Sequence, residues 1–273
     1  TAGLRIRGDF INDASYLHNS GTVFFDGAGT QTIGGSSATT FYTVEVDGAG
    51  LSIATTPTIA DTLLLTDGTV TTGANRVIMA STGTITGAST SSYVIGTIEH
   101  NIPNAAAPTA HFPVGDATHF APVSLTFAGT TSGSGSLTVT TTAGDHPNIA
   151  TSHGDPTRSV NRYWTIDNTT VAGFTSYDAT FSFPAGELDG GVTTSALAVR
   201  RYTSGAWTVP VSTNQLPTST TGTGMTGFSD FAIAEGIPDA AETSLTPTTA
   251  SITADGVSTQ VLTVTARDAG GNP

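Results

Sequence analysis

A short phrase of glycine followed by threonine and a β-branched residue recurs through the first hundred positions. It stands at 21–23, 68–70, 83–85 and 96–98. Glycine supplies the backbone freedom that a tight corner needs, and the Thr/Val or Thr/Ile pair after it favours an extended strand. Only short strands and Gly, Asp, Ser or Asn corners lie between the copies, so burial has to come from stacking. The pattern predicts a β-solenoid, in which each short rung stacks on the next.

Composition extends the all-β prediction to the whole chain. The sequence contains 32 glycines and only 11% charged residues, and Thr and Val are abundant. Thr and Val suit pleated strands, whereas Gly suits the corners between them. No window combines a sustained 3.6-residue apolar period with freedom from Gly, Pro and Thr clusters, so we expect no long helix. The 273 residues are enough for two or three domains.

The charge balance restricts the partners of the chain. The formal net charge is −13, and all eight basic residues are arginines. Such a chain repels phosphate backbones, so we expect no nucleic-acid partner. An acidic, Thr-rich surface and the absence of cysteine fit an extracellular cell-surface protein that is stabilised without disulfides. The chain begins at Thr1 and has no signal peptide or transmembrane run, so it looks processed or excised.

The repeats carry a resemblance. Gly-Thr-Val-Phe-Phe-Asp-Gly-Ala-Gly-Thr-Gln-Thr-Ile at 21–33 and Leu-Leu-Leu-Thr-Asp-Gly-Thr-Val at 63–70 resemble the repeated β-helical segments of very large bacterial surface proteins, the adhesin-like class. The resemblance covers roughly residues 5–100 and implies a setting, not an activity. We therefore predict a short, parallel β-helix-like solenoid over residues 1–100.

Residues 101–236 form a second predicted unit. It begins with the small-residue linker 101–108, and short strands separated by turn signals then follow at regular spacing, as in a β-sandwich. The sequences Phe-Pro-Val-Gly at 112–115, Asn-Arg-Tyr-Trp-Thr-Ile at 161–166 and Phe-Ser-Asp-Phe at 228–231 resemble, in that order, a sandwich module of the same surface proteins. The resemblance to that module implies no activity for residues 101–236.

Residues 237–273 form a third pattern. The sequences Ala-Asp-Gly at 254–256, Gln-Val-Leu-Thr-Val-Thr-Ala at 260–266 and Asp-Ala-Gly-Gly-Asn-Pro at 268–273 resemble the opening of a bacterial Ig-like domain of the invasin/intimin type. Only two or three of about seven strands are present, and so small a piece is not stable alone. Either the polypeptide continues, or another chain or the preceding module covers the edges. The segment is thus an incomplete Ig-like piece, an inter-subunit linker or a donor strand. The candidate inter-subunit strand consists of Gln260, Val261, Leu262, Thr263 and Val264.

Two binding hypotheses compete with ordinary structural roles. The aromatic residues Tyr163, Trp164 and Trp207 are candidates for a glycan site, although core or edge packing is the simpler explanation for both tryptophans. Asp26, Asp47 and Asp67 each precede a glycine and are candidates for Ca²⁺ coordination. Asp-Gly is also a common plain turn, and no EF-hand or nonapeptide spacing is present.

The remaining polar residues do not form a recognisable catalytic or zinc pattern. Two groups contain histidine and aspartate close together in sequence, namely His111, Asp116 and His119, and His146, His153 and Asp155. Neither has a zinc-ligand spacing, so loop histidines are the simpler interpretation. Solenoid enzymes that cleave polysaccharides need carboxylates converging on one groove, which the sequence does not offer. We therefore predict no enzyme and no required cofactor.

These observations lead to a structural hypothesis. The chain is expected to be a subunit or segment of a bacterial surface stalk, filament or surface layer, which assembles with copies of itself or with further modules of the same polypeptide, in part by strand addition. The alternative is an adhesin or glycan-binding module of a large surface protein.

Overall fold

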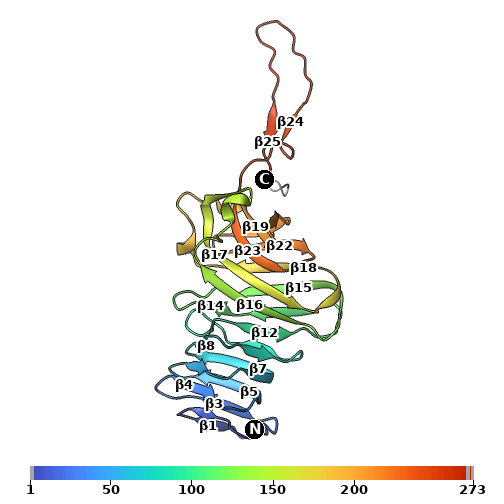
Figure 1. The fold of residues 1–273 in the computed structure, drawn as a ribbon. Coiled ribbons are helices and arrows are strands. Elements are labelled where there is room, and N and C mark those ends of the chain that lie inside the picture. The colour runs from blue at the N-terminus through green and yellow to red at the C-terminus, as the bar shows by residue number, and fades with distance from the viewer. Residues whose placement is uncertain (1–2, 269–270, 272–273) are drawn as a thin grey trace.

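A computed structural model describes residues 3–268 and residue 271. The last positions of the predicted Ig-like segment, 269, 270, 272 and 273, and the first two of the predicted solenoid lie outside these described residues. The chain is nearly all β, with 53% strand and 3% helix. It is elongated, with the N-terminus at one end and a projecting hairpin at the other (Figure 1).

The first part of the chain is a β-solenoid built from two ladders of parallel strands. The first ladder contains β1 (Leu4–Ile6), β3 (Thr22–Phe25), β5 (Thr39–Asp47), β7 (Pro57–Asp67), β9 (Val77–Met79) and β12 (Ile98–Asn101), with β10 (Thr84–Thr86) beside β7. The second ladder contains β2 (Phe10–Ile11), β4 (Gln31–Gly34), β6 (Leu51–Ile53), β8 (Val70–Thr71), β11 (Val94–Ile95) and β14 (Val114–Gly115).

Equivalent apolar residues stack in register through the solenoid. Val23 pairs with Val44, Val44 with Leu63, and Leu63 with Ile85. All four side chains are buried. Because alternate residues of a strand face opposite sides, the neighbours of these four residues along each strand point away from the core. The rungs therefore share one continuous apolar column.

Glycine corners allow the rungs to approach closely. Gly68 has a φ of +78°, and a Cβ added there would lie 2.2 Å from the carbonyl oxygen of Gly48 in the neighbouring rung. No side chain fits at such a distance, so only glycine permits this stacking. The Gly-Thr-Val phrase at 68–70 thus combines a required corner with the strand that follows it.

The second parallel ladder continues beyond residue 100. Val94 of β11 pairs in parallel with Val114 of β14, although the sequence assigns Val114 to the second predicted unit. The chain first leaves the solenoid to form β13 (Thr109–Phe112), which pairs antiparallel with β15 (Val123–Ser132), and then returns for this last rung. The two units are therefore interleaved between residues 101 and 123.

The first ladder also continues, as an antiparallel sheet. Strand β12 pairs in parallel with β9 on one side and antiparallel with β16 (Ser136–Ala143) on the other. The same sheet then runs through β17 (Gly154–Thr169), β23 (Ser229–Gly236), β19 (Leu197–Thr203) and β20 (Ala206–Thr208). One twelve-stranded sheet therefore extends from the first rung into the second half of the molecule (Figure 1).

A five-stranded antiparallel sheet lies against this extension. It contains β13, β15, β18 (Ala172–Ser182), β22 (Ser219–Met225) and β21 (Ser212–Leu216). Phe181 of β18 contacts Trp164 of β17 and Phe231 of β23, with both pairs of ring centroids 5.1 Å apart. These rings belong to one hydrophobic cluster that reaches from Val23 to Ile233. The solenoid and the second half therefore share a core.

Short elements complete the fold. The helical segments that the structure describes are the 3₁₀ turns η1 (Ile149–Thr151), η2 (Ala185–Glu187) and η3 (Thr194–Ala196). Two further strands, β24 (Ser244–Thr246) and β25 (Thr263–Thr265), pair with each other in a hairpin. The hairpin projects from the body at the end opposite the first rung (Figure 1).

Candidate functional site

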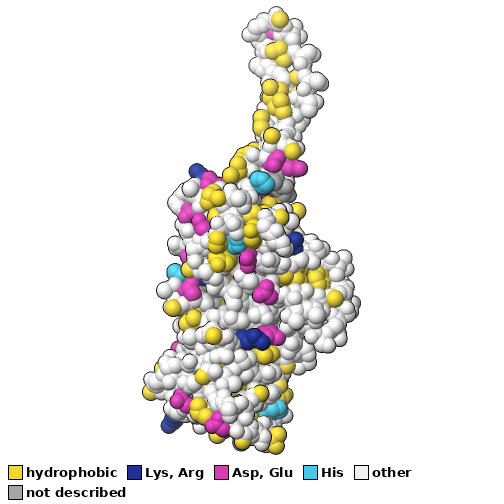
Figure 2. Space-filling model, viewed as in Figure 1, with side chains coloured by type: hydrophobic (Ala, Val, Ile, Leu, Met, Phe, Trp, Pro, Cys, Tyr) yellow, Lys and Arg dark blue, Asp and Glu magenta, His cyan; other side chains and the backbone are white. Residues whose placement is uncertain are grey.

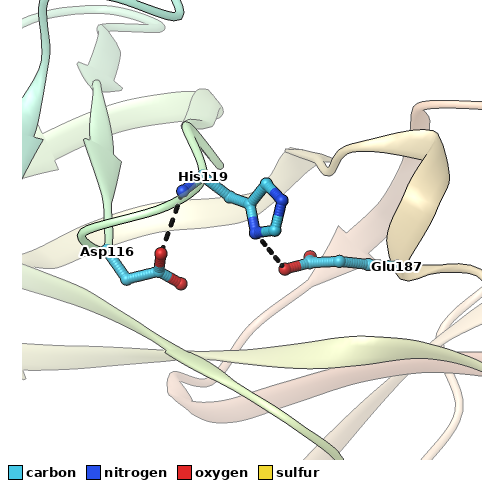
Figure 3. A group of neighbouring side chains, drawn as sticks. All are labelled: Asp116, His119 and Glu187. Atoms are coloured by element: carbon cyan, nitrogen blue, oxygen red, sulfur yellow. Dashed lines mark hydrogen bonds and ion pairs between the residues drawn. The ribbon is translucent and has the colours of Figure 1, made fainter.

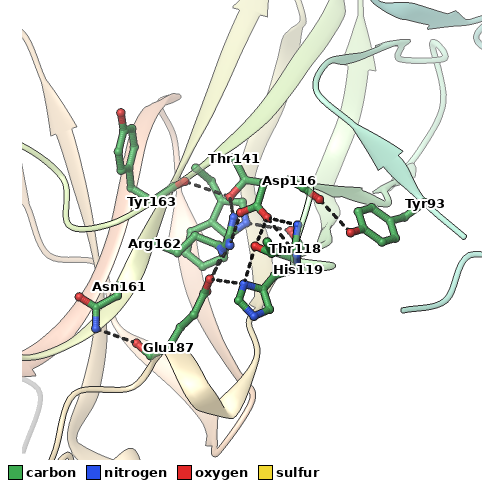
Figure 4. A network of polar contacts seen from close by, with 11 residues as sticks. Tyr93, Asp116, Thr118, His119, Thr141, Asn161, Arg162, Tyr163 and Glu187 are labelled. Carbon is green, nitrogen blue, oxygen red and sulfur yellow. Dashed lines mark hydrogen bonds and ion pairs between the residues drawn. The ribbon is translucent and has the colours of Figure 1, made fainter. Parts of the chain in front are cut away.

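The most developed polar site lies where the solenoid meets the second half, around Arg162 of β17. Its guanidinium Nη2 lies 2.6 Å from Asp116 Oδ2 and 2.5 Å from Glu187 Oε1, and its Nε lies 2.7 Å from Glu187 Oε2. The Arg162 side chain is fully buried. Asp116 follows the last parallel strand β14, and Glu187 ends η2 (Figure 4). We call these three residues the arginine clasp.

Further hydrogen bonds fix the clasp to both halves. Arg162 Nη1 donates to the hydroxyl of Thr141 on β16 at 3.1 Å. The Tyr93 hydroxyl donates to the backbone carbonyl of Asp116 at 2.8 Å, which holds the loop after β14 against the previous rung (Figure 4). The clasp therefore connects the last rungs of the solenoid with β16, β17 and η2.

The ionisation of the clasp follows from these contacts. Burial raises the pKa of Asp116, but hydrogen bonds from Thr118 and Arg162 more than offset it and hold that pKa well below its usual range. Burial lowers the pKa of Arg162, and the two carboxylates reverse this, so the pKa of Arg162 is raised. Asp116 and Arg162 are thus charged at neutral pH, and the guanidinium exchanges water for contacts with two carboxyl groups.

Asp116, His119 and Glu187 also meet a geometric criterion for a metal site, because one ligand atom from each lies within 4.8 Å of the others (Figure 3). Their lone pairs are nevertheless occupied. Asp116 Oδ1 accepts hydrogen bonds from the backbone N–H of Thr118 and of His119, at 2.7 and 2.9 Å. Both oxygens of Glu187 accept from Arg162, and His119 Nδ1 lies 3.1 Å from Glu187 Oε1. A cation would compete with Arg162 for the same oxygens, so the donor set does not fit a metal.

A sequence signal for the clasp existed. In the strand from Val160 to Ile166, alternation places Val160, Arg162, Trp164 and Ile166 on one face, and all four are buried. An arginine among three apolar residues on an inward face requires carboxylate partners. The sequence places Asp116 and His119 together, but nothing in it identifies Glu187 as the second carboxylate.

The three aspartates of the calcium hypothesis lie on the stacked corners but are not brought together as a site. Asp47 pairs in register with Asp67. Asp26 instead forms ion pairs with Arg5 and Arg7, at 2.5 and 3.5 Å. Among the described residues, the group of three acidic or histidine side chains with converging ligand atoms is Asp116, His119 and Glu187. The calcium hypothesis for Asp26, Asp47 and Asp67 stays a prediction.

The three aromatic residues of the glycan hypothesis are also separated. Trp164 is fully buried, and its indole N–H donates to the carbonyl of Ala121 at 2.9 Å. Tyr163 is half-buried on the opposite face of the same strand, because adjacent strand residues point to opposite sides. Trp164 therefore offers no surface to a ligand, and the glycan hypothesis itself stays a prediction.

Tyr163 and Trp207 do come together, around His146. The His146 ring lies 5.1 Å from Tyr163, 5.0 Å from Trp207 and 4.8 Å from Tyr202, measured between ring centroids. His146 Nδ1 accepts a hydrogen bond from the Asn148 N–H, so in the neutral ring Nε2 carries the proton and faces Asp230 Oδ2 at 3.3 Å.

The indole N–H of Trp207 is also used within the protein. It donates to the Asn148 carbonyl and to the hydroxyl of Thr151, both at 3.1 Å. The polar edge of Trp207 and the edges of its neighbours thus serve the internal packing of η1 against β17 and β20.

The predicted inter-subunit strand lies in the projecting hairpin. Of its five residues, Thr263 and Val264 belong to β25, and Gln260 to Leu262 precede it. The exposed fractions of Val261, Leu262 and Val264 are 76%, 58% and 66%. Strand β25 pairs only with β24 among the described residues.

Comparisons with protein-family models, with curated proteins and with solved structures return no match. Within the part of the chain that the structure describes, no helix has the length and apolar character needed to cross a membrane.

Proposed function

We propose that this chain is a rigid structural element of a bacterial surface stalk, filament or surface layer, located outside the cell, and not an enzyme. The observation that carries the proposal is the single sheet that runs from β1 through β12 into β16 and on to β20. Modules joined by a flexible linker would each have their own sheets and core. Here the sheet and the hydrophobic cluster both cross the junction.

The arginine clasp supports the same function. It lies at the junction between the solenoid and the second half, and it ties β14, β17 and η2 with charged hydrogen bonds. Such bonds have defined geometry and resist sliding between the two parts. The sequence resemblances complete the proposal: residues 101–236 act as a sandwich module of giant surface proteins, and β24 and β25 as the first strands of an Ig-like unit.

The test is a distance measurement across the junction. The chain has no cysteine, so nitroxide labels can be introduced cleanly at Thr40→Cys on β5 and Ser204→Cys beyond β19, both exposed. Pulsed electron–electron double resonance should give one narrow distribution of distances between the two labels. The control pair Thr40→Cys and Thr71→Cys lies within the solenoid, and it sets the width expected of one rigid body. A much broader distribution for the pair that crosses the junction would refute the proposal.

A further inference from the structure

Arg201, on β19, has a guanidinium group without an acceptor in the protein. Its side chain forms no ion pair or hydrogen bond with any residue that the structure describes, and its Nε is buried. Six of the other seven arginines form ion pairs with Asp or Glu, and Arg267 donates to the carbonyl of Gly271. A buried N–H without an acceptor is costly, so the donors of Arg201 call for a bound group that accepts from them.

A lack of carboxylates does not explain the free guanidinium. The chain has 21 acidic residues and only eight basic ones, so most arginines can find an acid nearby. On the face shown in Figure 2, arginine atoms occupy only a few isolated patches. The reason must therefore lie in the place that Arg201 occupies in the fold.

The register of β19 directs Arg201 toward the space between the two sheets of the second half. Arg201 lies on the same face of its strand as Val199, which packs close to Gly222 of β22 in the five-stranded sheet. The adjacent strand β23 contributes Asp230, but this residue lies opposite Tyr202 and faces the other side of the sheet. Asp230 is therefore not available to Arg201.

The backbone at Gly227 fixes the position of the guanidinium. The hydroxyl of the buried Tyr177 donates to the Gly227 carbonyl at 2.6 Å. A Cβ added at Gly227 would overlap Nη1 of Arg201, so the guanidinium lies directly against this segment. Burial raises the pKa of Tyr177, and the positive charge of Arg201 acts in the opposite direction. Asp178 is exposed and instead accepts the N–H of Gly224, at 2.9 Å.

Arg201 lines a pocket with a volume of about 240 Å³. The other side chains of the pocket form an apolar wall and two hydroxyl groups, from Val209, Pro210 and Met225 and from Thr208 and Thr226. Thr208 pairs in register with Arg201. Ligand pockets combine apolar walls with a few polar groups that fix orientation, and drug-sized ligands need about 300 Å³ or more. This pocket therefore suits one small polar group on a cation.

We propose that Arg201 binds the carboxylate of a small acidic ligand, either one acidic sugar unit or one acidic amino acid, in this pocket. The planar fork of a guanidinium matches the two oxygens of a carboxylate, and such paired hydrogen bonds are strong. The hydroxyls of Thr208 and Thr226 lie at the same pocket and can bond the polar groups of the ligand. Binding at Arg201 is separate from the rigid structural function and does not depend on it.

The two methionines of the chain allow a direct test by NMR. Met225 lines the pocket, whereas Met79 is buried in the solenoid. With methyl-¹³C methionine, one signal therefore reports on the pocket and the other serves as an internal reference. Titration with sodium glucuronate or sodium acetate should shift the Met225 signal and leave the Met79 signal in place. Glucose, the neutral match of glucuronate, and sodium chloride at equal ionic strength should shift neither.

Two variants take the guanidinium out of the pocket without breaking an internal contact. Arg201→Gln removes the charge. Gly227→Ala displaces the guanidinium, because the added Cβ meets only the end of that flexible side chain. Both proteins should keep the melting temperature of the wild type, and each should weaken carboxylate binding by roughly tenfold or more. The matched control is Arg158→Gln, which removes an equal charge from an exposed arginine paired with Glu235 and should bind as the wild type does.

The titrations also separate the two sources of the carboxylate. Tighter binding of glucuronate than of acetate indicates an acidic sugar, and equal binding indicates a simple carboxylate such as an acidic amino acid. Either result supports a carboxylate site. The absence of a Met225 shift with both compounds overturns the proposal, and so does unchanged binding by Arg201→Gln. Inorganic phosphate that binds as tightly as acetate also overturns it, because the pocket would then accept any anion.

Discussion

Arg162 illustrates how a single side chain can determine the organisation of its surroundings. A fully buried guanidinium is costly unless its donors are paired, and here two carboxylates and the Thr141 hydroxyl pair them. The partners come from segments far apart in sequence, so the arginine holds the loop after β14 and the turn η2 in place. The contacts of Arg162 are thus part of the architecture of the junction.

Replacing Arg162 with methionine should destabilise the protein strongly. The substitution leaves Glu187 buried without its partner, which costs about 3–5 kcal/mol in comparable pairs. The control is Arg158→Met on the same strand, where a 46% exposed side chain pairs with Glu235, and the expected cost is below about 1 kcal/mol. Urea unfolding measures both. The double variant Arg162→Met with Glu187→Met should recover part of the loss. Equal losses for Arg162→Met and for the control Arg158→Met would contradict the role of the clasp.

His100 should make the stability depend on pH. Its side chain is buried on β12 beside Phe112, and burial lowers its pKa more than the carbonyls of Gly83 and Ala80 raise it. The folded state therefore binds a proton less readily than the unfolded state, whose histidine has a pKa near 6.5. The contribution of His100 to the free energy of unfolding is fully present above that pH and should be lost as the pH drops below it. The lowered pKa of Asp116 acts only below about pH 4, outside this window.

Urea midpoints of the wild type and of His100→Leu at pH 7.5 and pH 5 check this expectation. Leucine removes the titration and keeps an apolar side chain in the core. The variant should lose less stability on acidification than the wild type. An identical loss in both would show that His100 does not cause it.

At the scale of elements, the rung and its glycine corner form the repeating unit. The inward residues of each rung continue the column of the rung before it, as Val23, Val44, Leu63 and Ile85 do. The corners set the distance between neighbouring rungs, because the backbone atoms of one corner lie directly against those of the next. Strand sequences can therefore vary among apolar residues, whereas some corners accept glycine alone.

Gly68→Ala should be much more damaging than Gly8→Ala. An alanine Cβ at position 68 would meet the Gly48 carbonyl oxygen at 2.2 Å and would also require a φ of +78°. At position 8 a Cβ meets nothing within 4 Å. We expect a loss above about 2 kcal/mol for Gly68→Ala and a change within about 0.5 kcal/mol for Gly8→Ala. Thermal denaturation followed by circular dichroism measures the difference, and similar melting temperatures would contradict the corner argument.

At the scale of the whole molecule, the sequence predicts the all-β class and the stacked rungs. The signal is repeated and local: Gly-Thr-Val corners and alternating apolar residues recur within short distances, so each rung can be recognised by itself. The last rung is different. Val114 lies in a Pro-Val-Gly sequence that looks like a loop, and it becomes a strand only because Val94 lies beside it in the second ladder.

The candidate site shows the same difference between local signals, which the sequence reveals, and contacts between distant residues, which it does not. The inward position of Arg162 can be read from strand alternation, and the exposed hairpin around Val261 was expected as an unpaired piece. Glu187 could not be predicted, because it lies in a short 3₁₀ turn whose position depends on the surrounding loops. The sequence could not show how the aspartate and aromatic groups are arranged in space, because that depends on the contacts of each side chain. The carboxylate of Asp26 instead pairs with arginines, and strand alternation directs Trp164 inward.

One sheet changes from parallel to antiparallel pairing at β12, and this has a consequence for recombination of the coding sequence. A coding segment cut after residue 101 would separate β12 from β16 and would deprive β11 of β14. The same cut would divide Asp116 and Arg162 from the rungs that support them. Neither product would be a self-sufficient fold, so recombination at that point should be selected against. A cut after residue 236, at the end of β23, would leave these strand pairings and the arginine clasp intact.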